Sequence, residues 1–199
     1  MSPKYYSPTC ERNALPILRV LQTLLPGGGH VLEIGSGTGQ HAVVFGENLP
    51  GVVWQTSDLP ENHGSILAWQ QEAGLTNVLP PLLLDMHAPV WPQQAFDLVF
   101  SANTLHIMGW PEVERLFKGV GSVLKSGGLL CVYGPFNYGG RFTSDSNARF
   151  DASLRAMSAA QGIRDFEAVN ALATANGLAL QADHEMPSNN RLLAWTKTG

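Results

Sequence analysis

A strand-like apolar run that leads straight into three alternating glycines constrains this chain more than any other feature. Residues 31–34 read Val-Leu-Glu-Ile, the glycines are Gly35, Gly37 and Gly39, and a helical pattern begins directly after them. Glycine accepts positive φ angles and lets another molecule approach the backbone closely. A strand, a glycine turn and a helix N-terminus together present unpaired N–H groups to a ligand. The segment therefore predicts a βα corner that binds a nucleotide-like molecule.

The spacing of these glycines distinguishes two classes of ligand. It reads G-x-G-x-G, whereas the dinucleotide fingerprint reads G-x-G-x-x-G, and Gln40 stands where that fingerprint has its third glycine. Glu33 lies inside the strand just before the turn, where its charge would repel a pyrophosphate and favour a nucleoside with a positive group. S-adenosylmethionine is such a ligand. A glycine-rich βα turn that binds nothing is the open alternative.

Length and composition indicate one soluble domain. The chain has 199 residues with 44% hydrophobic content, and no repeat or linker-like stretch divides it, so we expect a single domain over residues 1–199. A net charge of −4 with only 12 Lys and Arg leaves no basic stripe, which argues against a nucleic-acid partner. The start has no signal-peptide pattern, and no apolar run approaches the ~20 residues that span a bilayer. We therefore expect a cytoplasmic protein with no membrane partner.

Strand and helix signals alternate along the whole chain, with a turn at residues 126–128 and an irregular third strand at Pro80 and Pro81. The expected strands are residues 30–34, 52–56, 77–84, 96–101, 129–133, 178–185 and 192–197. The expected helices are residues 14–25, 39–48, 61–73, 111–124, 147–160 and 165–176. Such alternation predicts an α/β, Rossmann-like fold with a seven-stranded, mostly parallel sheet and helices on both faces. The short loop before the last strand leaves no room for a helical crossover, so that strand should be antiparallel.

The residues that follow the strands point to the same ligand, because open α/β sheets bind ligands beyond the carboxyl ends of their strands. Asp58 follows the second strand, where a carboxylate can accept hydrogen bonds from ribose hydroxyls. Asp85 and Met86 follow the third, where an acid can accept from the adenine amino group and a methionine can pack on the ring. A single acid at a strand end is often only a turn former, but two in successive units favour an adenosyl-binding site.

Together these features resemble the class I S-adenosylmethionine-dependent methyltransferases, whose first motif also joins an acid to G-x-G-x-G. The motifs Y-x-P-x-x-E-R-N at residues 6–13 and E-I-x-S-G-T-G-Q-H at residues 33–41 resemble a smaller family more closely. Its members are called methyltransferase-like proteins and carry a domain-of-unknown-function label. Residues 54–58, 102–107, 133–137 and 186–190 extend this likeness over nearly the whole chain. The resemblance implies the class I methyltransferase fold and S-adenosylmethionine binding, with no settled substrate.

The expected cofactor-binding residues are Arg12, Asn13, Glu33, Gly35, Ser36, Gly37, Gly39, Asp58, Leu59, Asp85, Met86 and Asn103. The resemblance also implies that residues 1–26 fold over the cofactor as a lid, with Arg12 or Asn13 facing the methionyl carboxylate. A solvated helix start is the alternative for these two residues. The chain departs from the family at residues 157–161, where M-S-A-A-Q replaces a D-P-x-W-G stretch before G-I-R-D. If that stretch shapes the substrate pocket, the substrate preference of this chain should differ, but the sequence alone does not tell whether it does.

His106 is the expected catalytic residue, because it follows the fourth strand and histidine titrates near neutral pH. It would act as a general base or an orienting group for the methyl acceptor, or else fix the loop through a backbone bond. Asn137, Asn189 and Asn190 are expected to bind a polar substrate, although asparagine also favours turns. The other histidines show no spacing typical of a metal site, so we expect no metal.

The sequence therefore predicts methyl transfer from S-adenosylmethionine to a small polar acceptor that it does not identify. One alternative is a methyltransferase-like protein that binds the cofactor without turnover and serves as an interaction module, because fold does not determine function. The other is an NAD-dependent oxidoreductase, which the glycine spacing and the final hairpin disfavour.

Overall fold

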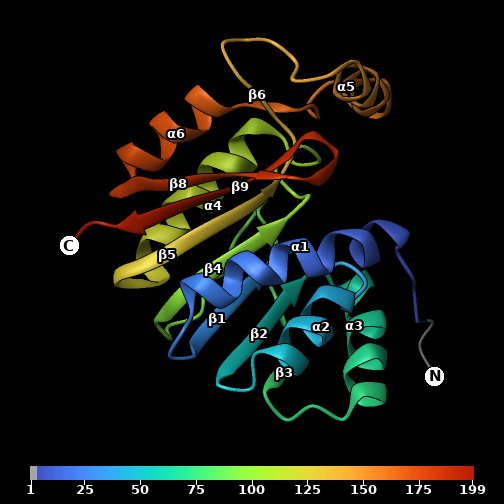
Figure 1. Cartoon of the computed structure of the whole chain (residues 1–199), viewed down its shortest axis with the longest axis vertical. Helices are drawn as coiled ribbons and strands as arrows, with labels where there is room; N and C mark the ends of the chain where they lie inside the picture. The colour runs from blue at the N-terminus through green and yellow to red at the C-terminus, as the bar shows by residue number, and fades with distance from the viewer. Residues whose placement is uncertain (1–3) are drawn as a thin grey trace. The chain divides into compact units, whose positions relative to one another are not determined.

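The computed structural model of the chain describes residues 4–199, in which helices and strands alternate (Figure 1). The helices are α1 Pro8–Leu24, α2 Gln40–Asn48, α3 Pro60–Ala73, α4 Trp110–Val123, α5 Asp145–Met157 and α6 Phe166–Ala175, with a short 3₁₀ turn at Pro187–Asn189. The strands are β1 Gly29–Ile34, β2 Val52–Asp58, β3 Val78–Leu83, β4 Phe96–Ala102, β5 Leu124–Gly134, β6 Phe136–Asn137, β7 Arg164–Asp165, β8 Leu178–Met186 and β9 Asn190–Lys197.

Seven of the strands form one sheet in the order β3-β2-β1-β4-β5-β9-β8. β1 pairs in parallel with β2 and β4, and β2 pairs in parallel with β3. β9 runs antiparallel to both β5 and β8. The prediction of a mostly parallel, Rossmann-like sheet with an antiparallel last strand is therefore confirmed.

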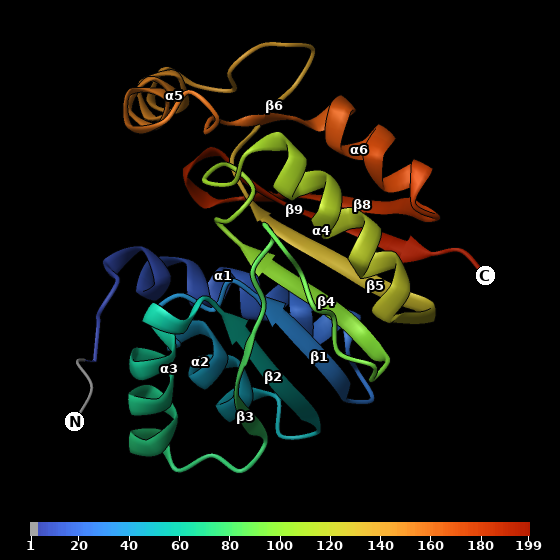
Figure 2. The ribbon, with the colours of Figure 1, turned by 180° about the vertical axis from the view of Figure 1, so that it is seen from behind.

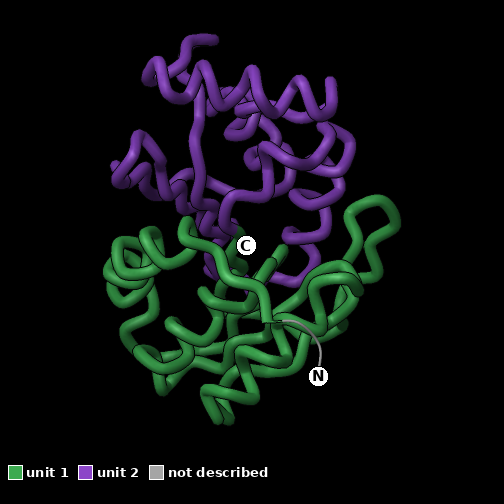
Figure 3. Tube along the Cα trace, turned by 90° about the vertical axis from the view of Figure 1, so that its right-hand side faces the viewer, with its two compact units in different colours: residues 1–101 green, residues 102–199 purple. Residues whose placement is uncertain are grey.

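Backbone contacts divide the chain into two compact units, residues 1–101 and residues 102–199 (Figure 3). In the first unit α1 packs against α2, α2 against α3, and α3 against β3. Its core is aromatic. The Phe45 ring lies 5.1 Å from that of Trp54 and 5.6 Å from that of Phe100, between centroids. All three side chains are fully buried, which anchors α2 on β2 and β4.

The first helix begins earlier than the predicted start at residue 14. Ser7 is its N-cap, with a side-chain oxygen that accepts a hydrogen bond from the Cys10 N–H at 3.3 Å, and Pro8 occupies the first helical position. Both residue types favour a helix start. The polar motif at residues 6–13 is therefore mostly helical.

In the second unit α4 packs against β5 and α6, and α6 packs against β8 (Figure 2). The Phe117 and Trp195 rings meet edge to face at 5.9 Å, and the Trp195 indole N–H donates to Asn170 at 2.9 Å. Two features differ from the predictions. β5 continues through the expected turn at residues 126–128, with Gly127 at φ +75°. β6 and β7 also form a small parallel pair that the sequence does not predict. Among residues 4–199, no helix is long and apolar enough to cross a membrane.

Candidate functional site

The glycine turn after β1 has the backbone that its sequence predicts. Gly35, Gly37 and Gly39 have φ angles of +72°, +57° and +93°, a region that only glycine enters freely. The Gly35 N–H donates to the Ser57 carbonyl at 3.0 Å, which ties the turn to the end of β2. A Cβ on Gly39 would lie 2.8 Å from the Cα of Ile66 in α3, whereas a Cβ on Gly37 would meet nothing within 4 Å. Packing therefore requires glycine at position 39, and the backbone at Gly37 is open to a ligand.

Asp58 holds this turn from the end of β2. Its Oδ2 accepts from the Gly37 N–H at 2.6 Å, and its Oδ1 accepts from the Leu59 N–H at 2.7 Å and from the Asn62 side-chain amide at 2.8 Å. A carboxylate has about four acceptor positions, so one is left for a ligand hydroxyl, and displacing Asn62 would free a second. Asn62 was not predicted from the sequence, because Asp58 ends β2 and Asn62 lies in the first turn of α3, so no helical spacing links the two residues.

Glu33 lies inside the fold, with 1% of its surface exposed. Its Oε2 accepts from the Trp54 indole N–H at 3.0 Å, and its carboxyl also hydrogen bonds to the Ser36 side chain. Burial raises the pKa of Glu33 to about 7, against these two hydrogen bonds, which lower it. The Ser57 N–H in turn donates to the Ser36 hydroxyl at 3.2 Å. Glu33 and Ser36 therefore support the turn from within the first unit.

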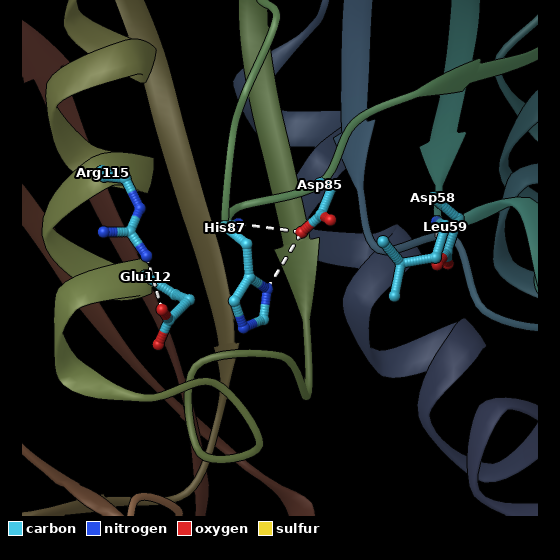
Figure 4. Close-up of polar contacts among 6 residues, drawn as sticks. All are labelled: Asp58, Leu59, Asp85, His87, Glu112 and Arg115. Atoms are coloured by element: carbon cyan, nitrogen blue, oxygen red, sulfur yellow. Dashed lines mark hydrogen bonds and ion pairs between the residues drawn. The ribbon is translucent and has the colours of Figure 1, made fainter.

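Asp85 and Met86 follow β3. Figure 4 shows Asp85 beside His87, whose backbone N–H and ring Nδ1 lie 2.8 Å and 3.1 Å from the Asp85 Oδ1. The Asp85 side chain is 40% exposed, which leaves its carboxylate accessible to a ligand. Met86 is buried and Leu59 is half-buried.

The N-terminal segment is fastened to the first unit by paired hydrogen bonds. The Ser7 N–H donates to the Gln40 side-chain oxygen at 2.5 Å, and the Gln40 side-chain amide donates back to the Ser7 carbonyl at 3.3 Å. The Tyr5 N–H donates to the Ser65 hydroxyl at 3.0 Å, and the Trp69 indole donates to the Tyr5 carbonyl at 2.8 Å. Gln40, which replaces the third glycine of the dinucleotide fingerprint, therefore ties this segment to the glycine turn.

The two neighbouring polar residues of α1 have different environments. Arg12 is exposed and donates to the Thr9 hydroxyl at 3.2 Å, whereas Asn13 is 8% exposed. His41 of α2 is buried and stacks on Phe45, with 5.3 Å between ring centroids. Burial lowers the pKa of His41 to about 4. Asn13 is therefore buried and Arg12 exposed, and the predicted role of either residue at the methionyl carboxylate stays a prediction.

His106 lies on the loop after β4, in the second unit, and is 6% exposed. Its ring meets that of Phe150 edge to face, with 5.2 Å between centroids. Burial, and then the positive charge of Arg164, lowers the pKa of His106 to about 4, so the imidazole is neutral at pH 7. A Cβ built on Gly134 would lie 3.8 Å from the His106 Nδ1 and 3.9 Å from the Asn103 Oδ1. Asn103 and His106 therefore flank the end of β5.

The three predicted substrate-binding asparagines differ in their surroundings. Asn137 is 8% exposed, and its Oδ1 has no hydrogen-bond partner within residues 4–199. Asn190 donates to the Tyr133 hydroxyl at 3.0 Å. Asn189 is exposed at φ +56°, which fits the turn-forming alternative, and its carbonyl accepts from Asn147 at 3.3 Å. Asn137 thus offers a buried acceptor atom. Tyr133, the partner of Asn190, was not predicted from the sequence.

No group of three or more His, Cys, Asp or Glu residues that could hold a metal ion occurs in the described part of the chain. A family model described as "Protein of unknown function (DUF938)" matches residues 4–197. The chain belongs to this family. Its fold is shared with solved methyltransferases of low sequence identity.

An O-methyltransferase family 2 protein from Planctomyces limnophilus, solved in complex with apigenin, matches this DUF938 protein with a TM-score of 0.84 at 18% identity, over 96% of this chain and 58% of that one. Human N-acetylserotonin methyltransferase, solved in complex with S-adenosylmethionine, gives a TM-score of 0.76 at 17% identity, with 96% and 53% covered. An O-methyltransferase family protein from Burkholderia thailandensis gives 0.79 at 16%, with 94% and 56% covered. The DUF938 chain thus spans little more than half the length of these proteins and shares their fold.

Proposed function

We propose that this chain is an S-adenosylmethionine-dependent methyltransferase that acts on a small molecule. The observation that carries the proposal is the turn at residues 35–39, which is open at Gly37 and joined by a hydrogen bond to Asp58 at the end of β2. The likeness of fold to methyltransferases, one of them solved with S-adenosylmethionine, supports it. The low net charge of −4 and the few basic residues argue for a small acceptor over a nucleic acid.

The chain's own residues fit this cofactor. The open backbone at Gly37 admits a ligand, and Asp58 has an acceptor position left for a ribose hydroxyl. Asp85 and Met86 would bind the adenine, and Asn13 or Arg12 the methionyl carboxylate. Leu59 and Asn103 complete the proposed set, with Glu33, Gly35, Ser36 and Gly39 supporting the turn. The bound cofactor supplies a methyl group on a positively charged sulfur.

On the acceptor side, His106 is neutral at pH 7 and therefore able to receive a proton. A base with a pKa of about 4 is weak, so proton removal favours an acceptor with an acidic O–H, such as a phenol or an enol, over an aliphatic alcohol. Phe150 beside the His106 ring supplies an apolar wall. The Asn137 Oδ1, which lacks a hydrogen-bond partner within residues 4–199, and the Asn190 side chain are the proposed polar contacts for the acceptor. The apigenin complex of one structural neighbour is in keeping with such a molecule.

Titration calorimetry tests the cofactor half of the proposal. S-adenosylhomocysteine should bind the wild-type protein and NADH should not, and Gly37→Val should abolish binding by filling the space at the turn. Binding of NADH alone would support the oxidoreductase alternative instead, and unchanged affinity in Gly37→Val would remove the turn from the site.

Release of S-adenosylhomocysteine, measured against a panel of small phenols, enols and aliphatic alcohols, tests turnover. His106→Ala should lower kcat by about 10²–10⁴-fold, with cofactor affinity unchanged. His30→Ala is the matched control, because His30 is exposed at the start of β1 and contacts Gln94. Cofactor binding without turnover of any acceptor would favour the interaction-module alternative.

A further inference from the structure

The G-I-R-D segment at residues 162–165 binds the loop that carries His106. The Gly162 N–H donates to the His106 carbonyl at 2.9 Å. The Arg164 Nε donates to the Leu105 carbonyl at 3.0 Å, and the same guanidinium donates to the Met108 carbonyl. Three carbonyls of one loop are therefore bound by two residues of one distant segment.

The same segment also pairs with β6. Phe136 lies opposite Arg164, and Asn137 lies opposite Asp165, in the parallel pairing of β6 with β7. Residues 162–165 thus contact both buried polar residues assigned above to the acceptor side, His106 and Asn137. We infer that Arg164 is a positioning residue that holds the His106 loop against the strand of Asn137, an inference that rests on the function proposed above.

The segment is itself firmly anchored to α5. The Ile163 N–H donates to the Asp151 Oδ1 at 2.7 Å, and the Arg155 Nε donates to the Asp151 Oδ2 at 2.7 Å. Gly162 has φ +145°, and a Cβ there would lie 2.7 Å from an Arg155 guanidinium nitrogen. The positive φ favours glycine at this position, and the hydrogen bond from Ile163 to Asp151 fixes residues 162–165 on α5.

The chemistry of the contact requires arginine. A guanidinium carries five N–H donors in a planar fork, whereas a lysine ammonium is a compact group with three donors on a flexible stem. Arg164 uses this fork on three carbonyls, because it also donates to the Ala160 carbonyl at 2.9 Å. Ala160 lies within residues 157–161, where the chain departs from the family pattern. The segment that differs from the family pattern is therefore hydrogen-bonded to Arg164, which in turn binds the loop that carries His106.

Arg164 also acts on His106 through its charge. It is the charged group that lowers the pKa of His106 in addition to burial, and Phe150 is the ring neighbour. Loss of the guanidinium should therefore have two separable effects. The loop gains mobility because its carbonyl bonds are lost, and the imidazole protonates more easily because the neighbouring charge is gone.

The experiment is NMR titration of ¹⁵N-labelled histidine, with amide hydrogen exchange, in the full chain. In Arg164→Gln the His106 titration midpoint should rise above its wild-type value, while burial still holds it below that of a free imidazole. The Gly162 amide should exchange about tenfold faster or more. Arg164→Lys keeps the charge, so its midpoint should stay closer to wild type while the exchange still accelerates. Arg149→Gln removes an exposed charge from the same helix α5 as Asp151 and should change neither quantity.

Wild-type midpoint and exchange in a folded Arg164→Gln variant would overturn the inference. If Arg164→Gln does not fold, Arg164→Lys decides, because normal exchange at Gly162 in that variant would equally refute positioning. Calorimetry with S-adenosylhomocysteine separates the two proposals. Absence of binding in the wild type would refute the proposed function, whereas the NMR result concerns residues 102–199 and stands on its own.

Discussion

Two glycines of one turn, Gly37 and Gly39, should respond differently to the same substitution. Gly39→Ala places a methyl group 2.8 Å from the Ile66 Cα, a backbone atom of α3 that cannot rotate away. Gly37→Ala places the same methyl group where nothing lies within 4 Å. The first change should destabilise the fold, and the second should chiefly weaken ligand binding.

The magnitudes follow from these contacts. A left-handed backbone costs an alanine about 1–2 kcal/mol, and both positions have positive φ, +57° at Gly37 and +93° at Gly39. Overpacking against fixed neighbours adds about 1–3 kcal/mol, and it applies to Gly39 alone. Gly39→Ala should therefore lower the free energy of unfolding by about 2–5 kcal/mol, and Gly37→Ala by about 1–2 kcal/mol.

Urea unfolding of both variants, followed by calorimetry with S-adenosylhomocysteine, measures the two effects. With a slope of about 2 kcal/mol per molar urea, Gly39→Ala should shift the midpoint by about 1–2.5 M and Gly37→Ala by about 0.5–1 M. Gly37→Ala should weaken binding by about tenfold or more, equivalent to about 1.4 kcal/mol, while folded Gly39→Ala keeps its affinity. Equal destabilisation in the two variants would refute the packing argument, and normal affinity in Gly37→Ala would refute ligand approach at that glycine.

Three other changes should give measurable effects. Asp58→Ala should weaken binding of S-adenosylhomocysteine in calorimetry by about 1–3 kcal/mol, because a hydrogen-bonding partner is lost. Acid should destabilise the fold between about pH 6.5 and pH 4, because burial lowers the pKa of His41 and His106 to about 4. Each histidine should therefore lower the free energy of unfolding by about 3 kcal/mol as the pH falls through this range. The raised pKa of Glu33 has the opposite effect on stability, which it increases as the pH falls from about 7 to 4.5. Because His41→Phe removes one of the two histidine contributions, its free energy of unfolding, measured in urea, should fall less steeply with acid than that of the wild type. Gln40→Ala should increase hydrogen exchange of the N-terminal segment at least tenfold, and unchanged protection would separate Gln40 from that segment.

Local patterns were sufficient to predict most of the fold. The strand at residues 29–34 and the helix after it follow from an apolar run, a glycine turn and a helical period, all close in sequence. The antiparallel last strand follows from a loop too short for a helix. The early start of α1 depends on Ser7 acting as an N-cap, a role that many serines could fill and few do.

Contacts between distant segments were not predictable. β6 and β7 each have two residues, too few for any period to appear, and the segment that contains α5 separates them in the sequence. Arg164 recognises backbone carbonyls, which every residue carries, so its target leaves no signature in the sequence. The glycines and Asp58 were predictable because their residue types are restricted at a nucleoside-binding corner, whereas Asn62 joins Asp58 only through the geometry of α3.

The two prolines of β3 have a consequence for how molecules of this chain meet one another. β3 has a neighbouring strand on one side only, and its partner register shifts between Gln55 and Ser57, opposite Pro80 and Pro81. Leu83, the last residue of β3, is 58% exposed. An edge strand with unpaired backbone groups and an exposed apolar side chain can pair with a strand of another molecule. Proline has no N–H to donate, which interrupts the ladder that an incoming strand would need. The two prolines therefore disfavour pairing between this edge of the sheet and strands of other molecules.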